Sequence, residues 1–368
     1  MDPFSQAALG AVVAQVAGHR ELGYRAALWG AAAGALPDVD ALFSVGGDFF
    51  DQLVTHRGIT HSLFFAPVVG PLLGALVWRW ERHRDPGHEG SRSRWMLVIS
   101  LALLSHPLLD LLTPYGTQLL SPFSDARFAI NAMPIIDPIY TLILGLGLLL
   151  GWLPALRNRL RTTHIALVTL ILSSAYLGYG WLQNARAESA ARDQLAAVGI
   201  SPTRLSAFPT LLQVYLRRVV ARSPDVDRVG FYSTWSPCEI TWFTAPRSDP
   251  AVYRDFLETR AGRIFDWFAM GWAHYSVHAG PDGRTLLASD LRYGFDDDPL
   301  VSVFTVTSAL DEANHPVGTA LAGRSTPADS ERTLAQLLTR TYAPACQILG
   351  RGAIPDRLDH NGPAPAAP

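Results

Sequence analysis

Residues 55–80 read THRGITHSLFFAPVVGPLLGALVWRW and join a pair of histidines to a long apolar run. Two histidines, His56 and His61, stand five residues apart around an Arg-Gly pair, directly before an apolar run. The run, residues 62–80, is long enough to cross a bilayer, for which about 20 residues suffice. Because an ionisable side chain at membrane depth is costly, it marks a functional candidate by default. The stretch therefore predicts a membrane helix that begins at a polar, functional face.

Further apolar stretches lie on both sides of this one. Three long stretches follow at residues 95–113, 135–153 and 162–182, and two shorter ones, rich in Ala and Gly, precede it at 4–18 and 24–36. We expect the short pair to form short or tilted helices that pack closely through small residues, with a surface amphipathic hairpin as the alternative. Of the 368 residues, 49% are apolar and only 17% are charged, which favours membrane segments in part of the chain. The net charge of −2 gives no basic field that would indicate a nucleic-acid partner.

The arginines predict the orientation of these segments. Residues 79–94 carry five arginines and residues 157–161 carry three, so both loops are expected to stay in the cytoplasm. Six crossings then place everything after about residue 183 outside. We therefore expect a multi-pass protein of the inner (plasma) membrane with an extracytoplasmic C-terminal domain. In that compartment Cys238 and Cys346 could form a disulfide.

The second half of the chain differs in kind from the first. Residues 188–199 and 211–222 (LLQVYLRRVVAR) are interpreted as helices, and residues 228–235, 238–245 and 301–310 as strands. Residues 274–295 have the pattern of a hairpin with Asp-Gly at its turn. The predicted fold class is an all-α membrane helical bundle, residues 1–183, followed by a soluble α+β domain, residues 184–353. The Pro/Ala-rich tail, residues 354–368, is expected to be disordered.

Ionisable residues gather at the predicted outer ends of the helices. His106 and Asp110 are one turn apart on one helix face. Imidazole nitrogens and carboxylate oxygens are ligands for zinc and similar divalent ions. Taken singly, a His-x-x-x-Asp pair can be a packing pair, and a Pro-Asp such as Pro37-Asp38 can be a helix stop or cap. Asp137, which precedes Pro138, is expected to cap the helix that follows it. The convergence of three histidines and three aspartates favours a metal site; its candidate ligands are Asp38, Asp40, His56, His61, His106 and Asp110.

Five motifs also carry a family resemblance over residues 1–140. They are MDPFSQAALG, GALPDVDAL, HRGITHSL, SHPLLDLLTPYGTQLLSPFS and IIDPIY, in this order. They resemble the LexA-regulated, membrane-bound, metal-dependent hydrolases of bacteria and archaea, a family distantly similar to zinc-dependent phospholipase C. The resemblance implies a divalent metal at the six candidate ligands, and a hydrolase. The family usually opens Asp-Pro-x-Thr-His, but this chain has Gln6 at the position of that histidine. Either the position is not essential, or one ligand is lost and metal binds more weakly.

Together these features predict an integral membrane hydrolase that uses one or two divalent ions, zinc or else manganese. We expect it to cleave a phosphoester of a membrane lipid or lipid-linked substrate at the outer interface. Asp38 and Asp40 would ligate metal or act as general base, while Arg57 would meet the anionic substrate. A transporter is one alternative, but it would need polar residues that continue to the cytoplasmic side. A catalytically degenerate scaffold, whose membrane part only anchors the soluble domain, is the other.

Overall fold

The computed structural model describes residues 1–87, 90–153, 158–280, 283–296, 298, 300–324, 330–343 and 346. The tail expected to be disordered, residues 354–368, lies outside these described residues.

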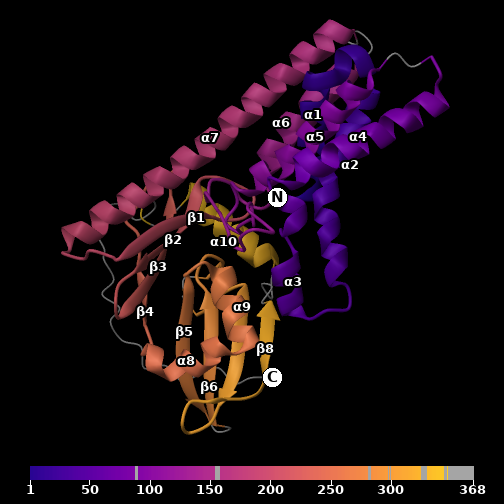
Figure 1. Ribbon diagram of the computed structural model, residues 1–368. Helices are drawn as coiled ribbons and strands as arrows, with labels where there is room; N and C mark the ends of the chain where they lie inside the picture. The colour runs from indigo at the N-terminus through magenta and orange to yellow at the C-terminus, as the bar shows by residue number, and fades with distance from the viewer. Residues whose placement is uncertain are drawn as a thin grey trace.

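The first half of the chain is helical. Its elements are α1 (Pro3–Leu22), α2 (Arg25–Ala35), the 3-10 helix η1 (Leu36–Ser44), α3 (Phe49–Thr55), the 3-10 turn η2 (Ile59–His61), α4 (Phe65–Arg84), α5 (Arg92–Asp110), α6 (Pro138–Trp152) and α7 (Arg159–Ala197). In Figure 1 the first part of α7 runs beside α6, and the helix then continues past the other helices to the sheets. The short helix α3 lies below the helical group, next to α9 of the C-terminal part.

Helices α1 and α2 pack through glycines, as their Ala/Gly content predicts. A Cβ atom on Gly10 would lie 2.4 Å from the carbonyl oxygen of Gly30, and one on Gly34 would lie 2.6 Å from that of Gln6. Only glycine permits this approach of the two backbones. The close crossing places the carbonyl of Gly34 next to α5.

The expectation of an all-α membrane bundle with six crossings is wrong. Among the described residues, one helical segment, Arg161–Ala197, is long and apolar enough to span a membrane. A second span results only if Phe49–His61 and Phe65–Arg84, bent by 66° from each other, count as one. Helices α2 and α6 have 11 and 15 residues, or roughly 16 and 22 Å against a hydrocarbon core of about 30 Å. Apolar composition alone therefore overstated the number of spans.

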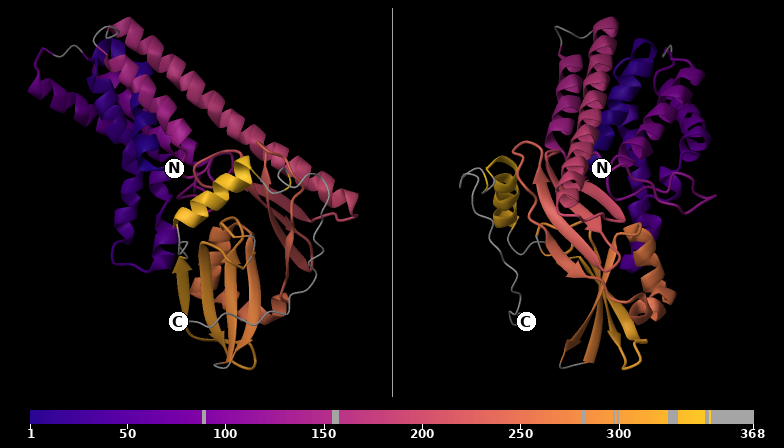
Figure 2. Two further views of the ribbon diagram at one scale, coloured as in Figure 1. Left: turned by 180° about the vertical axis from the view of Figure 1, so that it is seen from behind. Right: turned by 90° about the vertical axis from the view of Figure 1, so that its left-hand side faces the viewer.

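The C-terminal part holds two antiparallel sheets, with strand orders β1-β2-β3-β4 and β5-β6-β7-β8. The elements are β1 (Arg204–Pro209), β2 (Leu216–Arg222), β3 (Val226–Ser233), β4 (Phe243–Pro246), α8 (Pro250–Glu258), α9 (Arg260–Ala269), β5 (Ala273–Gly280), β6 (Gly283–Asp290), β7 (Phe304–Leu310), β8 (Pro316–Arg324) and α10 (Ser330–Tyr342). Figure 2 shows α8 and α9 on one side of the second sheet and α10 beside the first. A disulfide joins Cys238 to Cys346, whose Cα atoms are 6.3 Å apart.

Sequence patterns predicted most of these elements but misassigned β2. The hairpin β5–β6 and the strands at residues 228–235 and 301–310 are confirmed, and residues 188–197 form the end of α7. The helix predicted over residues 211–222 is wrong, because Leu216–Arg222 is a central strand between β1 and β3. In the sequence, Arg217 fits the polar face of a helix, but in the structure its side chain is fully buried. The guanidinium donates to the carbonyls of Asn131, Ala132 and Gly180, at 2.7 to 3.0 Å, and so ties this sheet to α7.

Candidate metal centre

Four of the six predicted ligands converge on one point. Asp38 comes from η1, His61 from η2, and His106 and Asp110 from one face of α5. One ligand atom from each residue lies within 4.8 Å of the others, in an arrangement that could hold a metal ion. The side chains of His61, His106 and Asp110 are fully buried, whereas that of Asp38 is 21% exposed. The group therefore opens on the side of Asp38.

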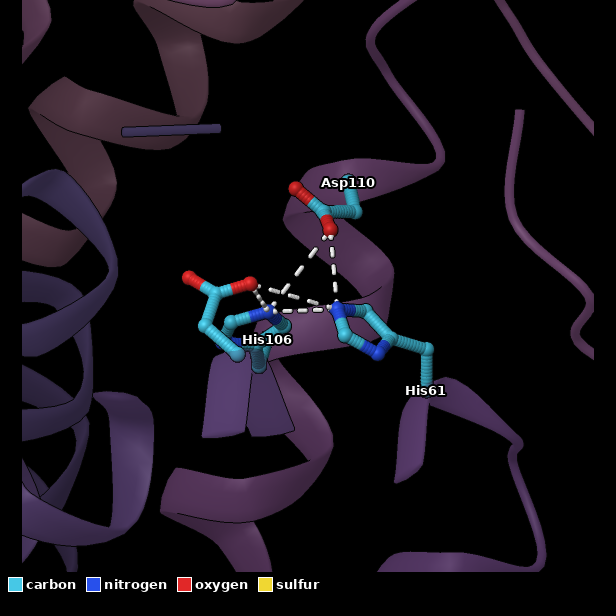
Figure 3. Close-up of side chains that lie close together, drawn as sticks. His61, His106 and Asp110 are labelled. Atoms are coloured by element: carbon cyan, nitrogen blue, oxygen red, sulfur yellow. Dashed lines mark hydrogen bonds and ion pairs between the residues drawn. The ribbon is translucent and has the colours of Figure 1, made fainter. Parts of the chain in front are cut away.

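The two imidazoles meet edge to edge at their Nε2 atoms, which are 2.9 Å apart. Figure 3 shows these nitrogens directed at each other, with a carboxylate oxygen of Asp110 beside them. The distances from Asp110 Oδ2 to the Nε2 atoms of His61 and His106 are 3.3 and 3.6 Å. Those from Asp38 Oδ1 are 3.5 and 3.4 Å. Two nitrogens and two oxygens therefore surround one small space.

Each of these histidines is anchored through its other ring nitrogen. His106 Nδ1 lies 2.6 Å from the carbonyl oxygen of Gly34, which can only accept a hydrogen bond. His61 Nδ1 lies 3.1 Å from Asp40 Oδ2. These partners place the proton of a neutral ring on Nδ1, which leaves its Nε2 available to a metal ion. A histidine whose second nitrogen is bonded to a carboxylate or carbonyl is typical of metal ligands.

Asp110 carries a further network of contacts. Its Oδ1 accepts a hydrogen bond from Gln6 Nε2 at 2.9 Å and contacts the α-amino group of Met1. Its Oδ2 is buried and accepts no hydrogen bond, although Arg57 Nε lies 3.0 Å away as an ion-pair partner. An oxygen in this state fits a metal ligand. The side-chain amide of Gln6 therefore helps to hold the carboxylate of Asp110 in place.

The side chain of Arg57, which the sequence predicts to meet an anionic substrate, is buried. Its side chain is only 4% exposed, and its Nη1 also donates to Thr113 Oγ1 at 2.7 Å. Its backbone adopts φ 62°, in the left-handed region, where its N–H donates to Asp40 Oδ2 at 2.8 Å. Arg57 therefore compensates the buried charge of Asp110 and shapes the turn between the two histidines.

Asp40 and His56 lie outside the group of four. Asp40 Oδ1 lies 2.9 Å from His56 Nδ1, and its Oδ2 orients His61. Burial by itself raises the pKa of Asp40, but hydrogen bonds from His56 and His61 outweigh it and hold the pKa well below its usual range. The pKa of Asp38 is lowered in the same way by His106 and His61. Both groups are therefore carboxylates at neutral pH, as metal binding requires.

Sequence reasoning did not identify every contributor to the site. The backbone carbonyl of Gly34 binds His106, but a backbone atom cannot be recognised as a partner from the sequence. The sequence shows only a glycine that suits the close crossing of α1 and α2. Tyr115 stands within the motif SHPLLDLLTPYGTQLLSPFS and is not among the candidate ligands, yet its ring lies 5.4 Å from that of His56. Asp137 is confirmed as a helix cap, since its side chain accepts from the backbone N–H of Tyr140 at 2.9 Å.

Removing the carboxylate of Asp40 is expected to weaken metal binding without abolishing it. Asp40→Ala leaves the four converging atoms in place but removes the carboxylate beside His61 Nδ1, so that Thr60 Oγ1, at 3.0 Å, is left to hold this side of the ring. Loss of such an outer partner costs about 10- to 100-fold in metal affinity. Competition against a chelating dye measures this for wild type and variant. An unchanged affinity would show that Asp40 does not orient His61.

The comparisons with known proteins indicate a protein of the inner membrane. The family model "YdjM inner membrane protein" matches residues 1–187. The chain belongs to this family. It is also 36% identical over 134 residues to the inner membrane protein YbcI of Escherichia coli (strain K12), an alignment that covers 33% of this chain and 73% of that protein. No solved structure matches.

Membership in the YdjM inner membrane protein family confirms the inner-membrane location predicted from the sequence. The matched residues include every member of the candidate metal centre and end within α7. The two sheets lie after the matched segment.

Proposed function

We propose that this protein is a metal-dependent hydrolase of the inner membrane that cleaves a phosphoester in a lipid or lipid-linked substrate. The observation that carries the proposal is the pair of Nε2 atoms, 2.9 Å apart, between the carboxylates of Asp38 and Asp110. Histidine nitrogens and carboxylate oxygens suit zinc, and manganese is the alternative.

Asp38, His61, His106 and Asp110 would hold the ion. When bound, a divalent ion supplies Lewis acidity toward a phosphoryl oxygen and a water molecule. The chain's own residues do the rest. Asp40 fixes the tautomer of His61, and Arg57 balances the charge of Asp110. The side chain of His56 is 31% exposed and is paired with Asp40 through Nδ1. Its second ring nitrogen, Nε2, is placed to accept a proton.

An exposed apolar stripe beside the site supports a lipid substrate. Phe64, Val68, Leu72, Leu76 and Trp80 recur every four residues from the start of α4, and each is between 43% and 64% exposed. This spacing puts them on one face of the helix. Because Phe64 stands three residues after His61, a face suited to acyl chains begins next to the candidate metal centre.

We also propose that the C-terminal domain is extracytoplasmic. The Cys238–Cys346 disulfide supports this, because disulfides persist outside the cytoplasm. In intact spheroplasts, a membrane-impermeant thiol reagent should label these cysteines only after reduction. Labelling that needs lysis of the cells would place the domain inside.

The hydrolase proposal is tested with purified protein in detergent and phospholipid or phosphodiester substrates. We expect release of a phosphate-containing product that a chelator stops and that zinc or manganese restores. Asp38→Asn should reduce the rate by at least about 100-fold, since it removes a charge from the ion's surroundings. Asp125→Asn, a change at an exposed carboxylate, is the matched control. Turnover that persists in the chelated protein would contradict the proposal.

A further inference from the structure

Residues 114–118 connect the candidate metal centre with the C-terminal domain. They begin four residues after Asp110 and are bonded to the segment that carries His56 and His61. The backbone N–H of Gln118 donates to the carbonyl of Arg57 at 3.1 Å, and its side chain donates to that of Val54 at 3.1 Å. A shift of this loop therefore shifts the turn between the two histidines.

Tyr115 is the centre of these contacts. Tyr115 is 6% exposed. The centre of its ring lies 5.4 Å from that of the His56 ring and 4.9 Å from Cζ of Arg57. On its other side the ring lies 5.1 Å from Phe268 of α9 and 6.5 Å from Phe304 of β7. One side chain thus touches both the metal-binding segment and the core of the C-terminal domain.

The C-terminal domain also holds the backbone of this loop. Arg292 Nη1 donates to the carbonyl of Pro114 at 2.8 Å, while its other nitrogens bind Asp290 and the carbonyl of Phe268. The approach is close: Gly116 has φ 84°, and a Cβ atom there would lie 2.8 Å from the sulfur of Met270. The loop is therefore seated on the domain at several points.

A second contact ties the start of the histidine segment to the C-terminal domain. Helix α3 ends at Thr55, directly before His56, and its Phe50 and Leu53 belong to the same buried core as Phe268. At the start of α3, Arg260 of α9 is ion-paired with Asp48 and Asp51. The turn that carries His56, Arg57 and His61 thus rests on the C-terminal domain through α3 as well as through the loop of residues 114–118.

We propose that Tyr115 is a positioning residue through which the C-terminal domain sets the geometry of the metal centre. The inference rests on the metal site of the proposed function and gives the C-terminal domain a role in it. The domain acts on the site through side-chain packing. Phe268 packs against Tyr115, and Tyr115 packs against His56 and Arg57. Removal of the support lets the His61 ring move away from His106.

The test uses the full-length protein loaded with Co²⁺, whose visible absorption reports ligand geometry, together with Zn²⁺ affinity. Phe268→Ala is compared with Phe265→Ala. Both phenylalanines are fully buried on α9, but of these two it is Phe268 whose ring contacts Tyr115 in the described structure. We expect Phe268→Ala to change the Co²⁺ spectrum and weaken Zn²⁺ binding by about 10- to 100-fold, and Phe265→Ala to leave both as in wild type.

Two further variants keep the test decisive. Tyr115→Phe retains the ring and should preserve the spectrum, whereas Tyr115→Leu should change it as Phe268→Ala does. If Phe268→Ala does not fold, Phe268→Leu takes its place. A wild-type spectrum and affinity in Phe268→Ala, Phe268→Leu and Tyr115→Leu would overturn this inference and leave the proposed function intact. Wild type that binds no metal would overturn both.

Discussion

Asp110→Ala is expected to abolish metal binding and to destabilise the N-terminal region. The carboxylate is fully buried, supplies one of the four converging atoms, and neutralises Arg57. Without it, the guanidinium remains as a buried charge with its ion-pair partner removed. Breaking a buried pair in this way costs about 3–5 kcal/mol. Thermal unfolding in detergent and metal analysis of the same sample measure the two effects.

Asp110→Asn separates charge from shape in this experiment. The amide keeps the volume of the side chain but not its charge. If Asp110→Asn loses the metal but is destabilised less than Asp110→Ala, the loss of metal comes from the missing charge. Asp125→Ala, at an exposed position, is the control and should change neither property. Metal binding at wild-type affinity in either Asp110 variant would contradict the assignment of Asp110 as a ligand.

Gly34→Ala is expected to have the second largest effect, through the packing of α1 against α2. The new Cβ atom would lie 2.6 Å from the carbonyl oxygen of Gln6 and 2.9 Å from the Cα of Gly10, so the two backbones must separate. Overpacking of this kind costs about 1–3 kcal/mol. The carbonyl that accepts from His106 Nδ1 moves with it, and metal affinity should fall about 10- to 100-fold.

Gly145→Ala in α6 is the matched control for this change, because a Cβ atom there meets nothing within 4 Å. It should leave metal affinity unchanged and alter the unfolding temperature little, since alanine also favours the helix. If Gly34→Ala unfolds at the wild-type temperature and binds metal equally well, the close crossing does not position His106.

The sequence predicts an element of this fold well when the interactions that form the element involve residues close together in the chain. Apolar runs locate α4 to α7, because a helix that is buried or faces lipid consists largely of consecutive apolar residues. They do not give the number of spans, which depends on helix length: α6 ends after 15 residues. Strand β2 was missed because the buried Arg217 finds most of its hydrogen-bond partners, the carbonyls of Asn131, Ala132 and Gly180, more than 30 residues away in sequence.

The same distinction applies to the candidate site. His106 and Asp110 share a helix face, so their spacing alone predicts that they point together. The choice of Asp38 as a converging group and Asp40 as the partner of His61 Nδ1 depends on where η1 meets η2, which spacing does not encode. The support by Tyr115 joins residues of both halves of the chain and follows only from the tertiary structure.

The most direct test of the metal centre is elemental analysis of the purified wild-type protein beside His61→Ala and His106→Ala. Each variant removes one of the two facing Nε2 atoms. We expect about one or two equivalents of a divalent metal in the wild type, as in structural and two-metal sites, and its loss in both variants. A wild type that holds no metal even after addition of zinc or manganese, or variants that retain it, would contradict the account.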